Sequence, residues 1–202
     1  MRTGTAGAPT SRSAWTGCKP PLGAQLPQAP GLWGLRLGAL LALDYAAQPV
    51  GAAPAQLLLW QPVLQGNAHL TQFLRLRVAA QMLGDGVADG GTEALRATLA
   101  GGSALEVAGY TLAPAMAGAL DRLDASRLPP PCPGPLAGTG AGRRPAAGAG
   151  LAARAARLAG GRGSMGRAQC VAGPAFWATQ EIAEAPALLA ATCAMLQEAC
   201  HA

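Results

Sequence analysis

The stretch GLWGLRLGALLALDYAA (Gly31–Ala47) decides the fold predicted for this chain. Its centre, GLRLG (Gly34–Gly38), places two glycines four residues apart around a single arginine, Arg36. An apolar stub precedes this pentapeptide, and an Ala- and Leu-rich run that favours a helix follows it and ends before Pro49. Because a tight strand-to-helix turn needs small flanking residues, the stretch predicts a strand, a sharp turn at Arg36 and a helix over Leu35–Ala47.

Downstream of this turn, an apolar run of strand length is followed by helical periodicity. Gln56–Pro62 is short, apolar and ended by proline, which suits a strand buried on both faces in a parallel sheet. Leu70–Leu83 repeats apolar residues at helical spacing. That apolar face consists of Leu70, Phe73, Leu74, Val78 and Met82. The alternation predicts an α/β fold, with a parallel sheet flanked by helices.

Five further elements are predicted along the rest of the chain. They are a helix over Thr92–Leu99, a strand over Leu105–Leu112, a helix over Pro114–Leu123, a strand over Gln169–Gly173 and a helix over Ala185–Ala199. Thr92 is the predicted N-cap of the first, because its hydroxyl can accept a hydrogen bond from the first turn. The last helix is expected to present one apolar face. That face comprises Leu189, Cys193, Leu196 and Cys200.

Two segments differ sharply in composition from the remainder. Met1–Pro30 and Pro133–Ala168 carry basic residues but no acid, and the second holds 10 glycines, 11 alanines and six arginines. Sequence of this kind, without apolar periodicity, is typical of disordered chain. We therefore expect both to be low-complexity, disordered segments. Their arginines lack interleaved aromatic residues for base stacking, so they do not indicate nucleic-acid binding.

The strand–turn–helix context of Gly34–Gly38 resembles G-x-S-x-G, the nucleophile elbow of α/β-hydrolases. The segments GLWGLRLGALLALDYA, LLLWQPVLQG, TQFLRLRVAAQML, LEVAGYTL and VAGPAFWATQEIAEAPALL together resemble the exosortase A system-associated hydrolase 2 family. The resemblance covers roughly Leu32–Leu128 and Cys170–Leu196. It implies an α/β-hydrolase domain with a helical cap over Leu70–Leu123, ester or thioester hydrolysis, and a role near bacterial exopolysaccharide production.

This resemblance divides the chain into four parts. Residues 1–30 are low-complexity, and residues 31–128 carry the elbow strand and helix, the following strand and the cap helices. Residues 129–168 are rich in Gly, Ala, Arg and Pro, and residues 169–202 supply the last strand and helix of the same domain. The low-complexity parts stand where family members carry ordinary strand and helix sequence, which indicates truncation or an altered reading frame. Translation of the other two frames tests this hypothesis.

The chain departs from a hydrolase at every catalytic position. Arg36 stands where the serine belongs, and a guanidinium is not a nucleophile near neutral pH. The segment expected to carry the triad acid, Pro133–Ala168, contains no Asp or Glu, and the region expected to carry the histidine reads GPAFW (Gly173–Trp177). His69 and His201 lie elsewhere. We therefore expect this chain to be inactive as a hydrolase.

The alternative function is non-catalytic binding of a ligand or partner by Arg36 and the cap region. A guanidinium at a helix N-terminus can bind phosphate or carboxylate, or it is a structural arginine of a vestigial elbow. Aromatic residues beside the carboxyl edge of a sheet either line a pocket or pack in the core. The candidate ligand-binding residues are Gly34, Leu35, Arg36, Leu37, Gly38, Phe176 and Trp177.

Neither a cofactor nor a metal is expected. GAGLAA (Gly148–Ala153) has the spacing of a dinucleotide fingerprint, but no strand precedes it and no acidic residue follows at the required distance. Cys193, Cys200 and His201 are too few for a metal site. The longest apolar stretch, Gly31–Leu43, is interrupted by arginine and too short to span a bilayer. Scattered cysteines and the lack of a signal peptide predict a cytoplasmic protein with free thiols.

Overall fold

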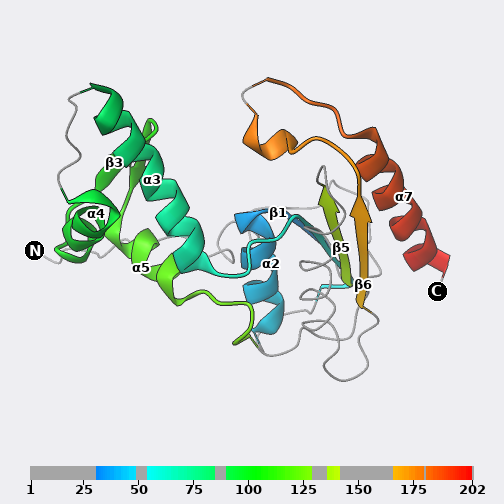
Figure 1. Cartoon of the computed structure of the whole chain (residues 1–202). Coiled ribbons are helices and arrows are strands. Elements are labelled where there is room, and N and C mark those ends of the chain that lie inside the picture. Colours follow the sequence, from blue (N-terminus) through cyan, green and yellow to red (C-terminus); the bar gives the residue numbers. More distant parts are fainter. Residues whose placement is uncertain are drawn as a thin grey trace, which may run out of the picture. The chain divides into compact units, whose positions relative to one another are not determined.

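The computed structural model describes residues 31–48, 54–84, 90–128, 136–141, 166–179 and 181–201. The contacts among them separate two compact units. One, the inserted unit, is Gln65–Asp124. The other, the sheet unit, comprises the described residues up to Leu64 and from Ala125 onward, so it is built from two parts of the chain (Figure 1).

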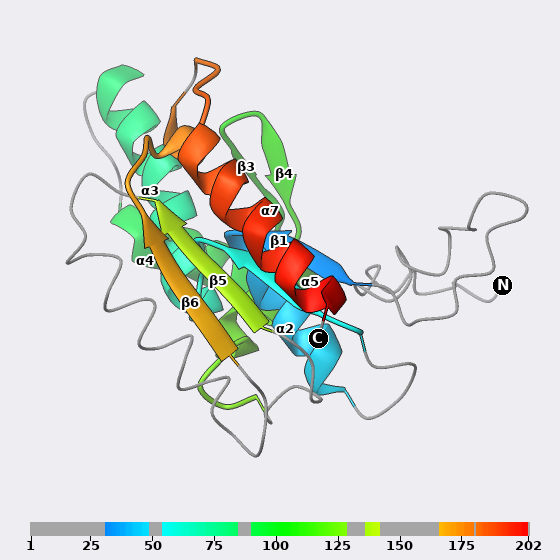
Figure 2. The same ribbon diagram turned by 90° about the vertical axis from the view of Figure 1, so that its right-hand side faces the viewer.

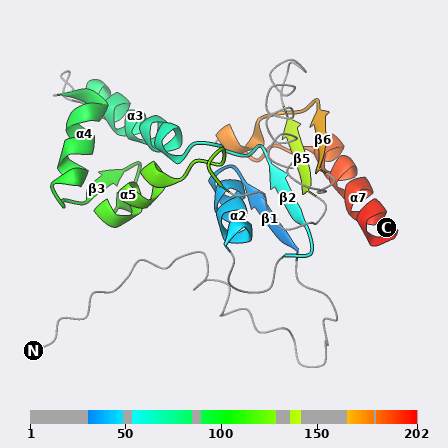
Figure 3. The ribbon, with the colours of Figure 1, turned by 90° about the horizontal axis from the view of Figure 1, so that it is seen from below.

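Within the described residues, the sheet unit holds four parallel strands. They are β1 (Leu32–Leu35), β2 (Leu57–Trp60), β5 (Leu136–Ala141) and β6 (Gly166–Val171), in the order β1-β2-β5-β6 (Figure 3). All four residues of β2 are buried, as the continuous apolar run predicted. The described chain is therefore a mixed helix-and-strand structure with a small parallel sheet, which fits part of an α/β fold.

Two helices cover opposite faces of this sheet (Figures 1 and 2). The helix α2 (Leu37–Ala47) contacts β1 and β2, and its buried residues recur at helical spacing. They are Ala39, Leu40, Leu43 and Ala46. The predicted helix is confirmed, with a later start because Leu35 ends β1. The turn between them is the single residue Arg36.

The second helix, α7 (Pro186–His201), lies against β5 and β6 with a different face from the one predicted. Leu189 is half exposed and Cys193 is exposed, whereas Leu188, Thr192 and Met195 are buried. The reason is a buried hydrogen bond of 3.0 Å that the Trp60 indole Nε1 donates to the Thr192 hydroxyl. A threonine does not count as apolar in a periodicity pattern, so the sequence pointed to the neighbouring face. The predicted face is therefore wrong for Leu189 and Cys193, whereas Leu196 is partly buried.

The prediction of a disordered segment over Pro133–Ala168 is wrong for part of its length. β5 lies entirely inside this range, and β6 begins in it. β5 pairs with β2 on one side and β6 on the other, and such ladders are formed by backbone groups that Gly and Ala also carry. Because β5 consists of small residues without an apolar pattern, the sequence did not predict a strand at this position. Met1–Pro30, residues 142–165 and the dinucleotide-like Gly148–Ala153 lie outside the described residues.

The inserted unit packs three helices with a small hairpin. Its elements are α3 (Gly66–Gly84), α4 (Gly91–Ala100), β3 (Leu105–Val107), β4 (Tyr110–Leu112) and α5 (Pro114–Arg122). The helix over Pro114–Leu123 and its proline start are confirmed. Leu70 and Leu74 of the predicted α3 face are fully buried, whereas Met82 is mostly exposed. Among the described helices, none offers the apolar length that a bilayer crossing requires.

Two local predictions in the inserted unit are wrong. The N-cap of α4 is Gly90 in a left-handed conformation, so Thr92 lies inside the helix and not at its cap. The single strand predicted over Leu105–Leu112 is an antiparallel hairpin, because Ala108 and Gly109 both adopt positive φ and reverse the chain. Consecutive positive φ values are what a two-residue hairpin turn requires, and glycine makes the second one easy to adopt.

Candidate functional site

The turn at Arg36 has the backbone geometry that the glycine spacing predicted. β1 ends at Leu35, α2 begins at Leu37, and Arg36 between them has φ 54° and ψ −114°. Arginine rarely adopts a positive φ, and such residues cost free energy that surrounding contacts must offset. Strained backbone of this kind occurs preferentially where a side chain is held for binding or catalysis. The geometry identifies Arg36 as the centre of a candidate site.

Backbone hydrogen bonds hold Arg36 in this conformation from both sides. Its N–H donates to the Trp60 carbonyl at 3.0 Å, and its own carbonyl accepts from the N–H groups of Val63 and Ala39, each at 3.2 Å. The Trp60 and Val63 bonds come from the chain that leaves β2, and the Ala39 bond comes from the first turn of α2. Both the chain at the end of β2 and the first turn of α2 therefore hold Arg36 in this conformation.

The two glycines of the pentapeptide have different roles. A Cβ added to Gly34 would lie 2.5 Å from the backbone N and Cα of Ala39 and from the carbonyl oxygen of Gly38. These are backbone atoms, so nothing nearby can move aside cheaply. A Cβ added to Gly38 meets nothing within 4 Å. Close approach of β1 to α2 therefore demands glycine at position 34 and leaves position 38 unconstrained.

Arg36 is the N-cap residue of α2, and the positive end of a helix dipole opposes a cation held near it. Partial burial lowers the pKa of Arg36 from its usual value, because desolvation disfavours the charged form. The group stays charged at neutral pH, because a guanidinium is too strong a base to lose its proton in a protein. No hydrogen bond or ion pair joins this side chain to a residue that the structure describes. Among the described residues, its charge is therefore left to solvent or to a bound anion.

The neighbouring elbow residues contribute little polarity of their own. Leu35 is exposed at the end of β1, and Leu37 is partly buried at the start of α2. Neither carries a hydroxyl, thiol or carboxylate, and the whole pentapeptide is equally without a nucleophile. Its chemistry is therefore that of a cation beside free helix N–H groups, which suits recognition of an anion.

Gln61 is a further polar residue of this region that the sequence analysis missed. It follows Trp60, the register partner of Leu35, and so stands directly after β2 as Arg36 stands directly after β1. Its backbone also has a positive φ, 42°, and its side-chain Oε1 is buried without a hydrogen-bond partner. The signal in the sequence is a lone polar residue between the apolar run of β2 and Pro62. By itself this residue indicates only that the strand ends there.

Phe176 and Trp177 lie in a short 3-10 helix, η1 (Phe176–Ala178), after β6. The Phe176 ring stands edge-on to Trp60 at a centroid distance of 5.9 Å and to Trp177 at 5.2 Å, and Trp33 contacts Trp60 at 4.7 Å. Phe176 also packs against a buried cluster of β2 and α7. That cluster consists of Leu58, Trp60, Leu188 and Met195. These contacts give Phe176 a packing role.

The triad partners that a hydrolase needs are not supplied by the segments expected to carry them. β5 has the sequence LAGTGA and β6 the sequence GRAQCV, so neither described strand carries a carboxylate. The histidines lie in other elements: His69 is in α3 of the inserted unit, and His201 ends α7. Arg36 is the one charged residue of Gly34–Gly38. The segments expected to carry the acid and the base of a triad provide neither for it.

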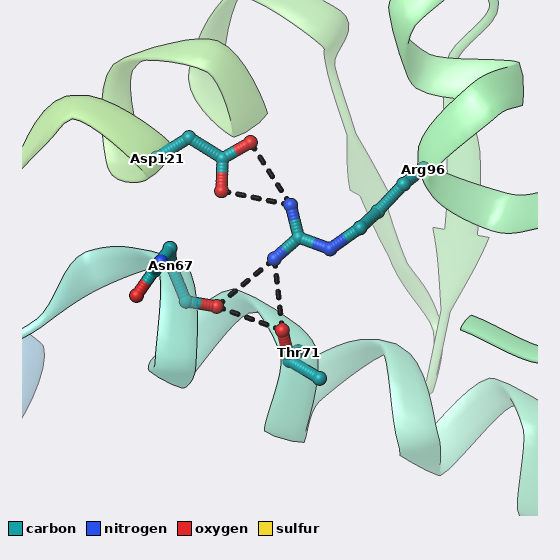
Figure 4. Close-up of polar contacts among 4 residues, drawn as sticks. All are labelled: Asn67, Thr71, Arg96 and Asp121. Atoms are coloured by element: carbon teal, nitrogen blue, oxygen red, sulfur yellow. Dashed lines mark hydrogen bonds and ion pairs between the residues drawn. The ribbon is translucent and has the colours of Figure 1, made fainter. Parts of the chain in front are cut away.

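A second polar cluster lies wholly in the inserted unit and is centred on Arg96 of α4 (Figure 4). Arg96 donates two bonds to the Asp121 carboxylate, at 2.8 and 3.0 Å, one to the Asn67 carbonyl at 2.9 Å and one to the Thr71 hydroxyl at 2.8 Å. The hollow of about 130 Å³ beside it is otherwise mostly apolar. Because the carboxylate balances the guanidinium, this cluster joins α3, α4 and α5 and does not offer a free charge.

We expect Arg96→Leu to lower the stability of the inserted unit by about 1–3 kcal/mol, because it removes the donor of the part-buried Thr71 hydroxyl and the links from α4 to α3 and α5. Asp121→Ala should cost at most about 1 kcal/mol, since an ion pair this exposed contributes little. Urea denaturation followed by circular dichroism measures both. Equal losses in the two variants would contradict this order and assign the stabilisation to the ion pair.

No family model matches the chain, and no curated protein shows significant similarity to it. The fold family and the function of the elbow consequently have to be inferred from the residues themselves. The features available for that inference are the conformation of Arg36, the lack of a described residue that pairs with its charge, the steric demand at Gly34 and the buried Gln61 Oε1 without a donor.

Proposed function

We propose that this chain is an α/β-hydrolase-fold protein, similar to the exosortase A system-associated hydrolase 2 family, whose elbow binds an anionic group instead of supplying a nucleophile. The observation that carries the proposal is Arg36 itself. It occupies a strained turn between a parallel strand and a helix, and its charge has no partner in the described chain. Such a strained and desolvated cation is costly, and an anion that binds it offsets the cost.

The order of the elements supports the hydrolase part of this proposal. In an α/β-hydrolase the elbow joins a parallel strand to the helix after it, as β1 and α2 are joined here, although β1 is the end strand of the described sheet. The next strand, β2, lies directly beside β1, and the inserted unit separates β2 from β5 in the chain. The resemblance implies a cap over Leu70–Leu123, and Gln65–Asp124 holds that sequence. The resemblance also suggests a setting in the bacterial cytoplasm near exopolysaccharide production.

The chemistry of the elbow supports binding over hydrolysis. A guanidinium is planar and can donate two parallel hydrogen bonds to one carboxylate or phosphate. The free N–H groups of the first turn of α2 point toward the same end of the helix and favour negative charge. Ester hydrolysis needs a group that attacks the carbonyl, and Gly34–Gly38 contains none.

Anion binding is tested by titrating the protein with inorganic phosphate at low ionic strength. We expect saturable binding to the wild type, a loss of at least tenfold in Arg36→Ala, and a smaller loss in Arg36→Lys, which keeps the charge but not the paired hydrogen bonds. Arg75→Ala is the matched control, because Arg75 is an exposed arginine of the inserted unit. An equal loss in Arg75→Ala would mean that phosphate responds only to net charge, and the proposal would fail.

Hydrolysis is the second candidate, because the elbow conformation is one that esterases also use. A p-nitrophenyl ester assay on the wild type and Arg36→Ala separates the two functions. We expect no turnover above the buffer rate in either protein. Turnover in the wild type that disappears in Arg36→Ala would assign a catalytic role to the elbow and overturn the binding proposal.

A further inference from the structure

Within the described residues, β1 is the end strand of the parallel sheet, and one of its edges has no strand beside it (Figure 3). The N–H groups of Leu32 and Arg36 donate to backbone carbonyls on the β2 side. Because backbone groups alternate in direction along a strand, the N–H and C=O groups of Trp33 and Leu35 point away from β2. These groups are available to a further strand.

The side chains along this open edge are apolar and exposed. Trp33 is 62% exposed and Leu35 is 37% exposed, and their spacing in the strand places both on one face of the sheet. The Trp33 ring contacts Trp60, whose indole donates to Thr192 of α7, so this is the face on which α7 packs. Because α7 lies against β5 and β6, it leaves the β1 end of that face open.

β1 has none of the features that normally keep an open strand edge from pairing. Natural proteins protect such edges with charged side chains, proline or a β-bulge. The sequence of β1, LWGL, contains neither a charge nor a proline, and its register with β2 is regular. An uncharged, apolar and regular edge favours a strand partner, and the lack of charge allows that partner to be an identical strand.

We propose that the outer edge of β1 is a dimer interface, where it pairs antiparallel with β1 of a second copy of this chain about a two-fold axis at Gly34. In this register Trp33 of each copy lies opposite Leu35 of the other, and the two residues exchange both of their backbone hydrogen bonds. Each exposed indole then packs against an exposed leucine, and such cross-strand apolar pairs stabilise a sheet. Gly34 places no side chain at the axis.

The two-fold register is the one that suits this sequence. Arg36 falls opposite Leu32 of the second copy, so the two cations do not face each other. A shift by two residues would place Trp33 opposite its own copy and Leu35 opposite Gly31, which has no side chain to pack against it. Two-fold pairing also uses the open edge of both copies at once, so the assembly is closed at the dimer. This inference is independent of the anion-binding function proposed for Arg36.

Sedimentation velocity of the full chain, over a range of protein concentrations, tests the dimer. We expect reversible association with a dissociation constant of about 10–100 μM, because a strand this short gives a small interface. Leu35→Lys should weaken it at least about tenfold, since it adds a charge to the edge and removes the leucine from the cross-strand pair. Ile182→Lys is the matched control, because it makes the same change at a fully exposed residue outside the sheet. Circular dichroism melts verify that both variants are folded.

Amide hydrogen exchange followed by NMR locates the interface in the wild type, whether or not Leu35→Lys folds. We expect the amides of Trp33 and Leu35 to exchange at least about tenfold more slowly when the concentration is raised from well below to well above the dissociation constant. The Gly34 amide points toward β2 and should not change. The same experiment distinguishes edge pairing from association through a helix face.

Three results would overturn the proposal. A wild type that stays monomeric at every concentration has no such interface. Association that continues past the dimer indicates non-specific edge aggregation and not two-fold pairing. A dimer that Leu35→Lys and Ile182→Lys leave equally stable, or in which exchange at Trp33 and Leu35 does not depend on concentration, uses another surface of the chain.

Discussion

Replacing Gly34 by alanine is expected to unfold the sheet unit or to cost it about 3 kcal/mol of stability, the upper end for overpacking. The added Cβ would lie 2.5 Å from three backbone atoms at the start of α2. Relief of that overlap requires α2 to move away from β1, which disrupts the burial of Ala39 and Leu40. Thermal melting followed by circular dichroism measures the loss.

Gly38→Ala is the control for this substitution, because the same methyl group is added four residues later. Its Cβ meets nothing within 4 Å, and the position lies in the first turn of α2. Alanine favours helix over glycine by about 0.5–1 kcal/mol, so we expect this variant to be slightly more stable than the wild type. Equal destabilisation by both substitutions would refute the close approach of β1 and α2 at position 34.

The second large effect is expected at Arg36, where stability and binding should change in opposite directions. Arg36→Gly relieves the strained φ of 54° and removes a cation from the N-terminus of α2. Strain of this kind costs about 1–3 kcal/mol, and the greater freedom of glycine in the unfolded chain offsets part of the gain. We expect the variant to be more stable by about 1 kcal/mol and to lose anion binding.

The position of the elbow could be predicted from the sequence, but not the reason for its glycines. Two glycines four residues apart, between an apolar stub and an Ala- and Leu-rich run, were enough to place a turn at Arg36. The spacing gave both glycines equal weight. The steric demand falls on Gly34 alone, because it arises where a strand and a helix approach closely in three dimensions.

Elements that depend on partners far away in the chain were harder to predict. β5 has small side chains and no apolar pattern, and it is recognisable as a strand through its pairing with β2 and β6. The buried face of α7 is set by a hydrogen bond between Trp60 and Thr192, which are 132 residues apart. Periodicity within one segment contains neither kind of information.

The sequence also identified some residues of the candidate site and missed others. Arg36 was identified from the sequence because it stands where a nucleophile is expected. Gln61 was missed, because its significance lies in a positive φ, a buried oxygen without a donor and its place directly after β2, the strand beside β1. Phe176 was left between a pocket and the core, and its contact with the cluster of β2 and α7 gives it a packing role.

Thermal melts of the wild type and Arg36→Gly, each with and without inorganic phosphate, test the central claim that a strained cation at the elbow binds anions. We expect Arg36→Gly to melt about 2–4 °C higher than the wild type without phosphate, as about 1 kcal/mol implies for a chain of this size. Phosphate should raise the melting temperature of the wild type alone. A lower melting temperature for Arg36→Gly, or an equal rise of both proteins with phosphate, would contradict the account.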